Sequence, residues 1–412
     1  MNLIDLLDEK KINFKFNISN RSEFGDVSLI NVQEEECFIE YCDKIERKTI
    51  FLNLFLNLET FDKLIHDFEF ISFEKLNFYI EYGSVNPTGF IHSGHRRNLA
   101  LGGTLSKILT FCKAFVFEEY FVNDSGGQLD NLLNSETEEY LSTKQSLPEH
   151  ILYNDQSDKQ KEVVNFIIEN TKQQLAQEGY NFNFVYETQM QKEYNCLDKH
   201  VISMSEDGRK IFNFKNNVKY LQKKNLEWTY FASDIFYLNY KQELNKKYNF
   251  KRMFMLFGLE QKDHAEPIIE IANSLNLNLK IFYYQLVSFE GKEFSKRNSV
   301  TQDYNYFTKN LNLFNYFLLS FRNTFHIDIT LNRIKEYENY CLKIKKHHYD
   351  NYKSVILGLY KLNQLIASII DRPGNVHSIS ILCIELMNFP TEHFIFRKLQ
   401  NFIIFCFNEC YN

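Results

Sequence analysis

The stretch from residue 76 to residue 124 constrains the fold more than any other part of this 412-residue chain. It begins with "LNFYIEYG" at 76–83, a run of aromatic and aliphatic residues that ends in glycine and is typical of a strand. After a loop, leucine and isoleucine recur every three or four positions from His95 to Leu109, as in an amphipathic helix. A second strand is predicted by "AFVFEEYFVND" at 114–124. A strand, a helix and a strand in this order form a βαβ unit, which implies a parallel sheet with a right-handed crossover.

A second α/β stretch follows much later in the chain. It contains a predicted strand at 252–260, a helix at 267–277 and another strand at 279–289. The residues between the two stretches are polar and are predicted to be mostly helical, notably at 159–179. Two α/β halves that are separated by an insertion indicate a doubly wound, Rossmann-type parallel sheet.

The length of the chain exceeds what one hydrophobic core usually supports, so we expect several domains. Residues 1–75 alternate short aromatic runs with polar breaks and predict a small α+β domain. Residues 76–310 form the α/β domain, with an insertion at about 130–225. From 311 to 412 the apolar residues follow a helical period, which predicts an α-helical bundle.

Charge and cysteine content favour a cytoplasmic protein. The net charge of −6 gives no general attraction to nucleic acid, although residues 321–412 hold 11 Lys and Arg against 8 Asp and Glu. The run "KIKKHH" at 343–348 fits a solvated helix face better than an RNA-binding surface. The eight cysteines are scattered without a CxxC pair, no secretory signal is recognised, and no apolar run is long enough to span a membrane. We expect no protein-bound metal, because no Cys/His cluster has ligand spacing.

The loop before the predicted helix has the chemistry of a phosphate site. It lies where a strand's carboxyl end meets a helix amino end, whose free N–H groups and partial positive charge attract anions. Gly94 leaves room for a nucleotide, and His92 and His95 can donate hydrogen bonds to an α-phosphate. Pro87 and Gly89 shape the loop. The tetrapeptide "HSGH" alone does not establish this, since two nearby histidines are more often structural or on the surface.

The wider segment, however, closely resembles the arginyl-tRNA synthetase family, whose members are class I synthetases with a His-x-Gly-His loop. The family has an Asn-Pro-Thr-Gly element, then His-x-Gly-His and an Arg, which are matched here by Asn86, Pro87, Thr88, Gly89, His92, Gly94, His95 and Arg97. It also has a Val-Asn-Asp-x-Gly-x-Gln element, which is matched by Val122, Asn123, Asp124, Gly126 and Gln128. The two flanking elements point to the arginine enzyme rather than to class I synthetases in general.

Three further matches follow in the family's order. "TYFASDIFY" at 229–237 is similar to the segment that lines the amino-acid pocket, and "GLEQKDHAE" at 258–266 resembles a segment in which Gln stands three residues before His. "EGKEFSKRNSVTQDY" at 290–304 looks like the Lys-Met-Ser-Lys-Arg signature, except that Glu293 replaces the first Lys and Phe294 replaces Met. Weaker matches at 23–29, 51–57 and 314–336 resemble the amino-terminal add-on domain and the entry to the helical domain.

The resemblance assigns roles to individual residues. It implies that Gly89, His92, Gly94, His95, Ser295 and Lys296 bind ATP, with His92, His95 and Lys296 as the catalytic groups. It implies that Glu81, Asn86, Tyr230, Asp234 and Gln261 bind arginine. Asp234 would pair with the guanidinium, and Tyr230 lies one helical turn earlier on the same face. Without the resemblance, Asp234 would more often be a surface residue of a helix.

The implied activity is that of an arginine–tRNA ligase. Arginine and Mg²⁺-ATP, both as substrates, would give arginyl-adenylate, and the arginyl group would pass to the 3′ end of tRNA(Arg). Residues 1–75 would contact tRNA, 311–412 would bind the anticodon, and we expect a monomer. Because both terminal parts are short for the family, two alternatives stay open. One is a homologue that forms arginyl-adenylate for an acceptor other than tRNA, and the other is a catalytically inactive binding paralogue.

Overall fold

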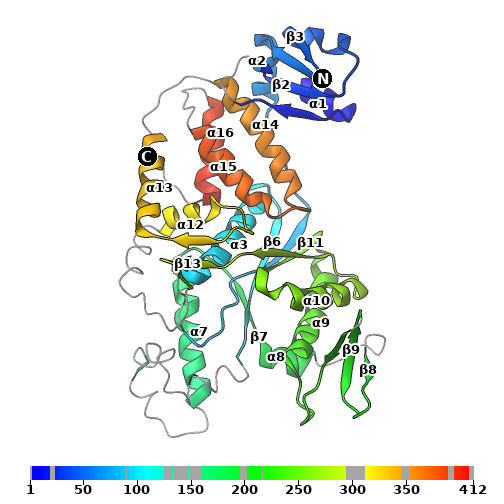
Figure 1. Cartoon of the computed structure of the whole chain (residues 1–412), viewed down its shortest axis with the longest axis vertical. Helices are drawn as coiled ribbons and strands as arrows, with labels where there is room; N and C mark the ends of the chain where they lie inside the picture. Colours follow the sequence, from blue (N-terminus) through cyan, green and yellow to red (C-terminus); the bar gives the residue numbers. More distant parts are fainter. Residues whose placement is uncertain are drawn as a thin grey trace. The chain divides into compact units, whose positions relative to one another are not determined.

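The structure is a computed structural model that describes residues 2–18, 24–89, 91, 93–124, 132, 147–148, 159–194, 202–215, 217–293, 311–344, 352–387 and 394–407. The chain divides into two compact units (Figure 1). One comprises Met1–Ser72 together with Asn332–Asn412, and the other comprises Phe73–Leu331.

A five-stranded sheet forms the centre of the second unit. Its strands are β5 (Asn77–Glu81), β6 (Phe115–Val122), β7 (Asn183–Tyr186), β11 (Arg252–Gly258) and β12 (Leu279–Tyr284). They lie in the order β12-β11-β5-β6-β7, and every neighbouring pair is parallel. The chain thus winds outward in both directions from the boundary between β5 and β11. This is the predicted doubly wound sheet, and that boundary is the switch point at which such sheets bind ligands.

Helices cover both faces of this sheet. One face packs on α3 (Ser93–Phe111), and the other packs on α9 (Tyr230–Tyr248) and α10 (Lys262–Ser274). Successive side chains of β6 point to opposite faces. Glu118 is hydrogen-bonded to Ser106 of α3, whereas the next residue, Glu119, accepts a hydrogen bond from Tyr237 of α9. The predicted helix after β5 is therefore confirmed, and the two faces of β6 carry different chemistry.

Two adjacent glycines let aromatic rings pack closely on α3. A side chain at Gly102 would collide with the ring of Tyr82, and one at Gly103 would lie 2.7 Å from the ring of Tyr180. Glycine inside a helix costs about 1 kcal/mol relative to alanine. The close approach of the two rings explains why the helix contains both glycines.

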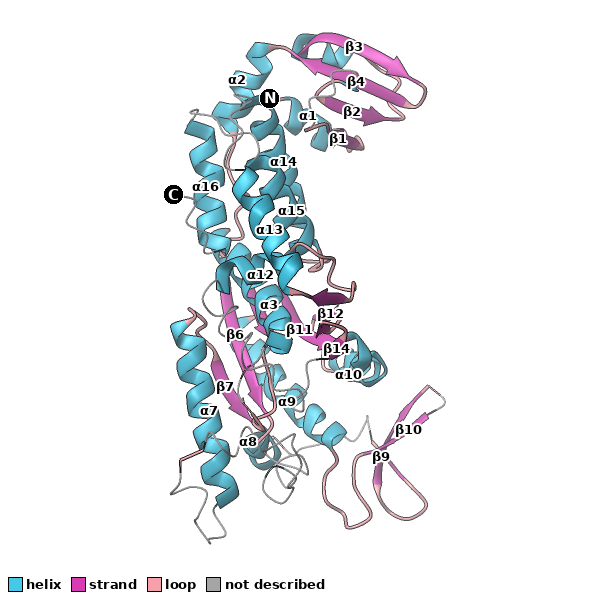
Figure 2. Ribbon diagram, turned by 60° about the vertical axis from the view of Figure 1, so that its left-hand side comes forward, coloured by secondary structure: helices cyan, strands magenta, loops and turns pink. Residues whose placement is uncertain are grey.

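The segment between the two α/β halves is not helical throughout. It contains α7 (Lys159–Gln177), α8 (Glu187–Glu193) and β7, which extends the main sheet beside β6 (Figure 2). It also holds an antiparallel sheet of β8 (Ser203–Met204), β9 (Lys210–Phe214) and β10 (Asn217–Tyr220). The helix expected at 159–179 is present, but the expectation of a mostly helical insertion missed these short strands, whose polar residues hide the alternation.

Beyond β11 the second unit contains several short elements. They are η3 (Leu259–Gln261), β13 (Val287–Phe289), β14 (Lys292–Glu293), α12 (Leu311–Leu319) and β15 (Ile327–Ile329). The strand expected at 279–289 is divided into β12 and β13, and β13 leaves the main sheet to pair with β14 and β15. Arg97 contacts the break between the two strands, as described below.

The first unit joins a sheet to a set of helices. The sheet has the order β1-β2-β4-β3, and its strands are antiparallel. The elements are α1 (Leu3–Glu9), β1 (Phe14–Phe16), β2 (Val27–Ile30), η2 (Glu36–Tyr41), β3 (Cys42–Lys48), β4 (Phe51–Leu56), α2 (Leu58–Asp67), α13 (Leu331–Ile344), α14 (Tyr352–Ser368), α15 (Asn375–Met387) and α16 (Phe394–Phe407). Helix α14 packs against α2, β1, α15 and α16. The α+β start and the helical end of the chain are thus present, and they share one unit.

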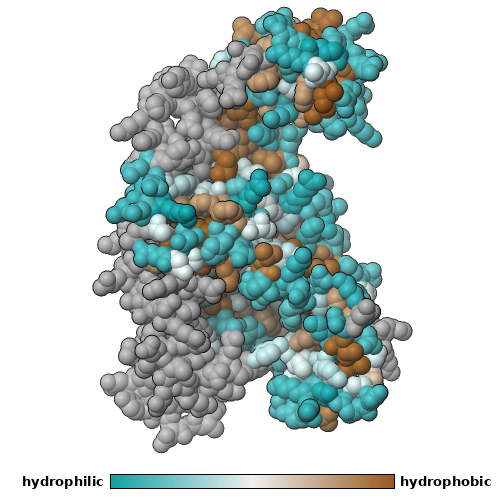
Figure 3. All heavy atoms as spheres, viewed as in Figure 1, coloured by the Kyte–Doolittle hydropathy of each residue, from teal (hydrophilic) through white to brown (hydrophobic). Residues whose placement is uncertain are grey.

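The visible surface of the described residues mixes hydrophilic and hydrophobic side chains (Figure 3). Exposed apolar residues such as Met204, Val218 and Leu226 are dispersed over the β8–β10 sheet and the turn after it. Single exposed apolar side chains are normal for a globular protein. Within the described ranges, no helix is long and apolar enough to cross a lipid bilayer.

Candidate functional site

The loop that follows β5 lies at the switch point, and its backbone is held by side chains from neighbouring elements. Gly83 has a φ of +88°, a conformation that glycine adopts easily. Its N–H donates to Oδ1 of Asn98 at 2.9 Å. The N–H of Val85 donates to the hydroxyl of Tyr120 at 2.9 Å. The loop is therefore fixed to both α3 and β6.

Two of the family-motif residues connect this loop to the end of β6. The amide of Asn123 donates to Oδ1 of Asn86 at 2.7 Å. Asp124 accepts from the backbone N–H of Thr188 at 2.9 Å and from its hydroxyl at 2.5 Å, so it caps the start of α8. These contacts place Asn86 beside the carboxyl end of the sheet, where a ligand would bind.

Two of the predicted nucleotide residues, Gly94 and His95, lie at the start of α3. Ser93 is the first helical residue, so Gly94 and His95 lie in the first turn, and His95 is half-buried. Their position at the positive end of the helix agrees with the sequence prediction. His92, Gln128, Ser295 and Lys296 are outside the described residues.

The Asn-Pro-Thr-Gly turn is packed against the interior. Pro87, Thr88 and Gly89 are buried. Pro87 and Gly89 border a cavity of about 10 Å³, whose other walls include Tyr120 and Phe184. This space fits about one water molecule. The buried turn therefore supports the loop from the interior. The predicted phosphate-binding residues Gly94 and His95 lie farther along the chain, at the start of α3.

Arg97 is fully buried, and its partners among the described residues are backbone carbonyl groups. Its guanidinium donates to the carbonyl oxygens of Gln285 at 2.8 Å, Phe325 at 2.6 Å and Arg322 at 2.6 Å. Burial lowers the pKa of Arg97 to about 10, so the group stays cationic at neutral pH. The family-motif arginine therefore joins the second turn of α3 to the break between β12 and β13 and to the turn before β15.

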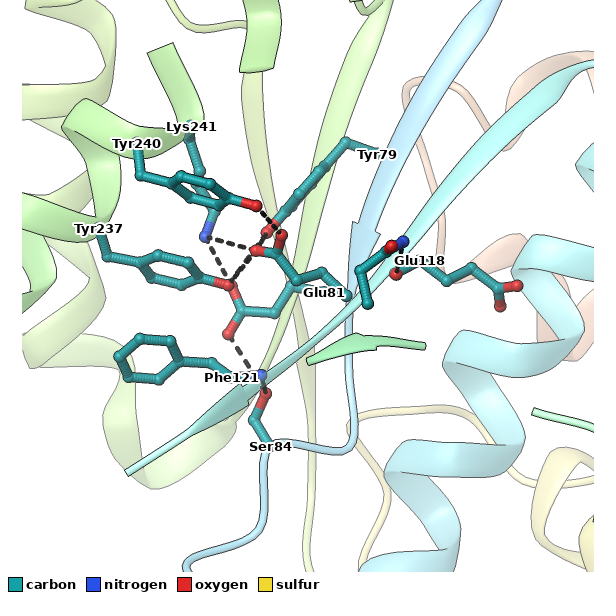
Figure 4. Close-up of polar contacts among 10 residues, drawn as sticks. Tyr79, Glu81, Ser84, Glu118, Phe121, Tyr237, Tyr240 and Lys241 are labelled. Carbon is teal, nitrogen blue, oxygen red and sulfur yellow. Dashed lines mark hydrogen bonds and ion pairs between the residues drawn. The ribbon is translucent and has the colours of Figure 1, made fainter. Parts of the chain in front are cut away.

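A buried ionic cluster lies on the other face of the sheet (Figure 4). The ammonium of Lys241 lies 3.0 Å from Oε2 of Glu81 and 4.0 Å from Oε1 of Glu119, and none of the Lys241 side chain is exposed. Glu81 is the last residue of β5, and it is paired in register with Glu119 of β6. A lysine can be buried in this way only when carboxylates compensate its charge.

Three tyrosine hydroxyls complete the cluster by donating to Glu119. They come from Tyr79 at 2.5 Å, Tyr237 at 2.5 Å and Tyr240 at 2.9 Å. Burial raises the pKa of Glu119, while Lys241 and the tyrosines oppose that shift. Burial likewise lowers the pKa of Lys241, and both carboxylates oppose it. The cluster holds two carboxylates against one ammonium, so with all three ionised it carries a net negative charge.

Glu81 has one oxygen directed to the cluster and one to the loop. Its Oε1 accepts from the hydroxyl of Ser84 at 3.4 Å, and that hydroxyl accepts from the N–H of Phe121 at 3.1 Å. Glu81 thus connects the ion pair with Lys241 to the loop at the switch point, and the family resemblance predicts that it contacts arginine.

Asp234 is paired with a histidine in the structure. Its Oδ2 lies 2.8 Å from Nε2 of His264, and the two side chains are 27% and 42% exposed. The hydrogen bond to Asp234 raises the pKa of His264. Gln261 is exposed, and its Oε1 accepts from the N–H of Gly258 at 3.2 Å. Tyr230, the first residue of α9, is 57% exposed.

The structure thus brings Glu81 and Asp234 to the same helix face, around Lys241. The sequence prediction missed Lys241, Glu119, Tyr79, Tyr237 and Tyr240. A signal for them exists, because Asp234, Tyr237 and Lys241 form a polar stripe at helical spacing in an otherwise buried part of α9. The adjacent glutamates of "FVFEEYFV" interrupt an apolar strand in the same way.

No group of three or more metal-ligating side chains is assembled among the residues that the structure describes.

Comparison with known sequences gives one consistent set of relatives, although no protein family model matches the chain. The arginine–tRNA ligase of Mesomycoplasma hyopneumoniae (strain 7448) is 30% identical over 275 residues, which cover 55% of this chain and 50% of that protein. The arginine–tRNA ligase of Mycoplasma mobile is 37% identical over 118 residues, or 27% of this chain and 22% of that protein. The chain spans about half the length of the first of these relatives.

Comparison with solved structures identifies the fold. The arginyl-tRNA synthetase of Thermus thermophilus matches with a TM-score of 0.63 and 13% identity over 99% of this chain and 91% of that one. The enzyme of Plasmodium falciparum matches with a TM-score of 0.61 and 16% identity over 95% of this chain and 88% of that one. The α/β fold with a helical carboxyl-terminal part is therefore that of these synthetases.

Proposed function

We propose that this chain, which is related by sequence to the arginine–tRNA ligases and has the fold of arginyl-tRNA synthetases, charges tRNA(Arg) with arginine. In the first step a carboxylate oxygen of arginine attacks the α-phosphorus of Mg²⁺-ATP, and pyrophosphate leaves. In the second step a ribose hydroxyl at the 3′ end of tRNA attacks the arginyl carbonyl carbon, and AMP leaves.

The observation that carries this proposal is the position of Asp234 on α9, on the helix face whose Lys241 pairs with Glu81 beside the switch point. Asp234 already pairs with a planar group that is cationic when protonated, the imidazole of His264, at 2.8 Å. A guanidinium is also planar and cationic, and it can form two hydrogen bonds with one carboxylate. Glu81 would take the α-ammonium group through the oxygen that faces the loop. Asn86, Tyr230 and Gln261 would complete the pocket.

ATP would bind at the amino end of α3. Gly89 and Gly94 leave space for the phosphates, and His92 and His95 would donate to the α-phosphate as its negative charge increases in the transition state. Ser295 and Lys296, which follow β14 in the sequence, would bind the departing pyrophosphate. The position of α3 at the switch point supports this arrangement, and the residues on the loop come from the family resemblance.

We extend the proposal to the rest of the chain. Residues 1–75 would contact tRNA, residues 76–310 would form the catalytic domain with its insertion at about 130–225, and residues 311–412 would bind the anticodon. The protein would act as a cytoplasmic monomer with ATP and Mg²⁺ as substrate and no resident metal.

ATP–pyrophosphate exchange with arginine, measured with and without tRNA(Arg), tests the first step, and aminoacylation of tRNA(Arg) tests the second. Charging of tRNA supports the proposal. Exchange without charging would indicate an adenylate-forming homologue with another acceptor. Complete absence of exchange in both conditions would contradict the proposal and indicate a binding paralogue.

A further inference from the structure

We propose that His264 is a resident counter-ion of Asp234 that the guanidinium of arginine displaces, so that arginine binding releases a proton. This inference rests on the proposed function, because it takes arginine as the ligand of Asp234. It adds a coupling between substrate binding and the protonation of a named residue.

The pair has the geometry that displacement requires. Nε2 of His264 lies 2.8 Å from Oδ2 of Asp234, within hydrogen-bond distance, and both side chains are partly exposed, at 42% and 27%. Phe231 lies about one helical turn before Asp234 on α9. Its ring packs edge-on against the imidazole of His264, with the ring centroids 6.1 Å apart. The imidazole therefore has an ionic partner in Asp234 and an aromatic neighbour in Phe231. Parts of both paired side chains are open to solvent, although Oδ2 of Asp234 is itself buried.

The charges around His264 favour its protonated form in the absence of substrate. Asp234 on α9 raises the pKa of His264 by a hydrogen bond and by its charge, while burial and Lys219 on β10 oppose the shift. On its own helix the neighbouring charged residues are Lys262, Asp263 and Glu266, and Glu266 is paired with Lys215 at 2.7 Å. Asp234 is thus the acidic group that decides the charge of His264.

Arginine would add a second cation to the same carboxylate. A guanidinium stays charged at every pH at which proteins are stable, whereas an imidazolium can lose its proton near neutrality. Two adjacent cations repel each other, so the imidazolium is the member that yields. Once its hydrogen bond to Asp234 is lost, the pKa of His264 falls, and the proton passes to solvent.

The linkage predicts the direction of the pH effect. Below the raised pKa of His264, arginine must compete with the imidazolium, and its affinity is low. Above that pKa the imidazole is neutral and leaves the carboxylate readily, so affinity is high. If one proton is released per arginine, affinity rises by up to about tenfold per pH unit below the pKa.

The test is calorimetric titration of the full chain with arginine from about pH 5.5 to about pH 8.5, the range in which histidine titrates. Two buffers with different ionisation enthalpies report the proton released. We expect arginine affinity to rise with pH in the wild-type protein. In His264→Asn the affinity should be nearly independent of pH and higher than that of the wild type at the acidic end.

A matched control is His66→Asn, since His66 pairs with Asp67 at 3.1 Å in the other unit and its side chain is 90% exposed. This variant should keep the wild-type pH dependence. The inference would be overturned if the arginine affinity of the wild-type protein did not change with pH, or if His264→Asn kept the wild-type pH dependence. In either case, arginine binding itself would still support arginine as the ligand. If neither the wild type nor the variants bind arginine at any pH, with or without ATP, both the proposed function and this inference are wrong.

Discussion

Lys241 and Glu81 form an ion pair of 3.0 Å although 160 residues separate them in the chain. The pair fastens α9 to the carboxyl end of β5. It lies at the point where the helix that carries Asp234 meets the strand that leads into the loop after β5. A disturbance of this pair therefore acts on both halves of the proposed pocket.

Replacing Lys241 with Met should destabilise the protein strongly, because Glu81 and Glu119 would remain buried without a cation. The expected loss is about 3 to 5 kcal/mol in the free energy of unfolding, measured by chemical denaturation. Lys246→Met is the matched control on the same helix, since Lys246 pairs with Glu243 in an exposed position. It should cost less than about 1 kcal/mol. If the two variants lost similar free energies of unfolding, the buried ion pair would not be essential for stability.

Replacing Asp234 with Ala should raise the arginine concentration needed for half-maximal exchange by about 10- to 100-fold, as expected for the loss of a charged hydrogen bond. The ATP requirement should change far less. Steady-state exchange assays with each substrate varied in turn measure both quantities. Asp263→Ala, on the exposed start of α10, serves as the control and should leave both values near those of the wild type. Equal effects on arginine and ATP would argue against the assigned role of Asp234.

Replacing Lys296 with Ala should slow adenylate formation by about 100- to 1000-fold, since one charge that stabilises the departing pyrophosphate would be lost. Arginine affinity should stay nearly unchanged. Single-turnover kinetics gives the rate, and equilibrium titration gives the affinity. Lys292→Ala provides a comparison, because that lysine stands beside the position where Glu293 replaces the family's first Lys. A parallel loss of arginine affinity in Lys296→Ala would contradict its role at the phosphates.

Replacing Arg97 with Met should remove the buried cation that donates to the carbonyl oxygens of Gln285, Phe325 and Arg322, and should cost at least about 3 kcal/mol. Hydrogen exchange offers a local measurement. The N–H of Gln285 donates to the carbonyl of Asn323 at 2.7 Å, and its protection should fall when Arg97 no longer holds both segments. Arg397→Met, at an exposed position of α16, should leave that protection intact. Unchanged exchange at Gln285 in Arg97→Met would refute this account.

The Asp234–His264 pair should also make stability depend on pH. The pKa of His264 is raised in the folded protein, so its contribution is complete below the ordinary value of 6.5 and is lost as pH rises through the folded-state pKa. Because the pair is partly exposed, the effect should be less than about 1 kcal/mol. The difference in Tm between the wild type and His264→Asn, measured at about pH 6 and about pH 8.5, should therefore shrink at the higher pH. A difference that grows with pH would have the wrong sign.

Much of the α/β fold was predictable from sequence because it depends on local patterns. The runs at 76–83 and 114–124 correspond to β5 and β6, and the apolar period after His95 corresponds to α3. The loop between them was identified by its glycines, proline and histidines. These features follow from the alternation of strands, the period of helices and the chemistry of loops, all of which are visible within a few residues.

The parts that were missed depend on distant residues. Lys241 has a partner 160 positions away, so no local pattern reveals that it is buried. β7 has only four residues and becomes a strand because β6 offers it an open edge. The packing of α14 against α2 likewise joins segments almost 300 residues apart. Tertiary contacts decide such features, and propensity cannot.

The paired glycines of α3 set a limit on engineering. Exchanging helical glycines for alanine is a common way to raise thermal resistance, because alanine restricts the unfolded chain. In this helix each added methyl group would meet an aromatic ring, Tyr82 for one glycine and Tyr180 for the other. The helix that carries His95 would shift to relieve the collision, so a more heat-tolerant variant of this protein has to be sought elsewhere in the chain.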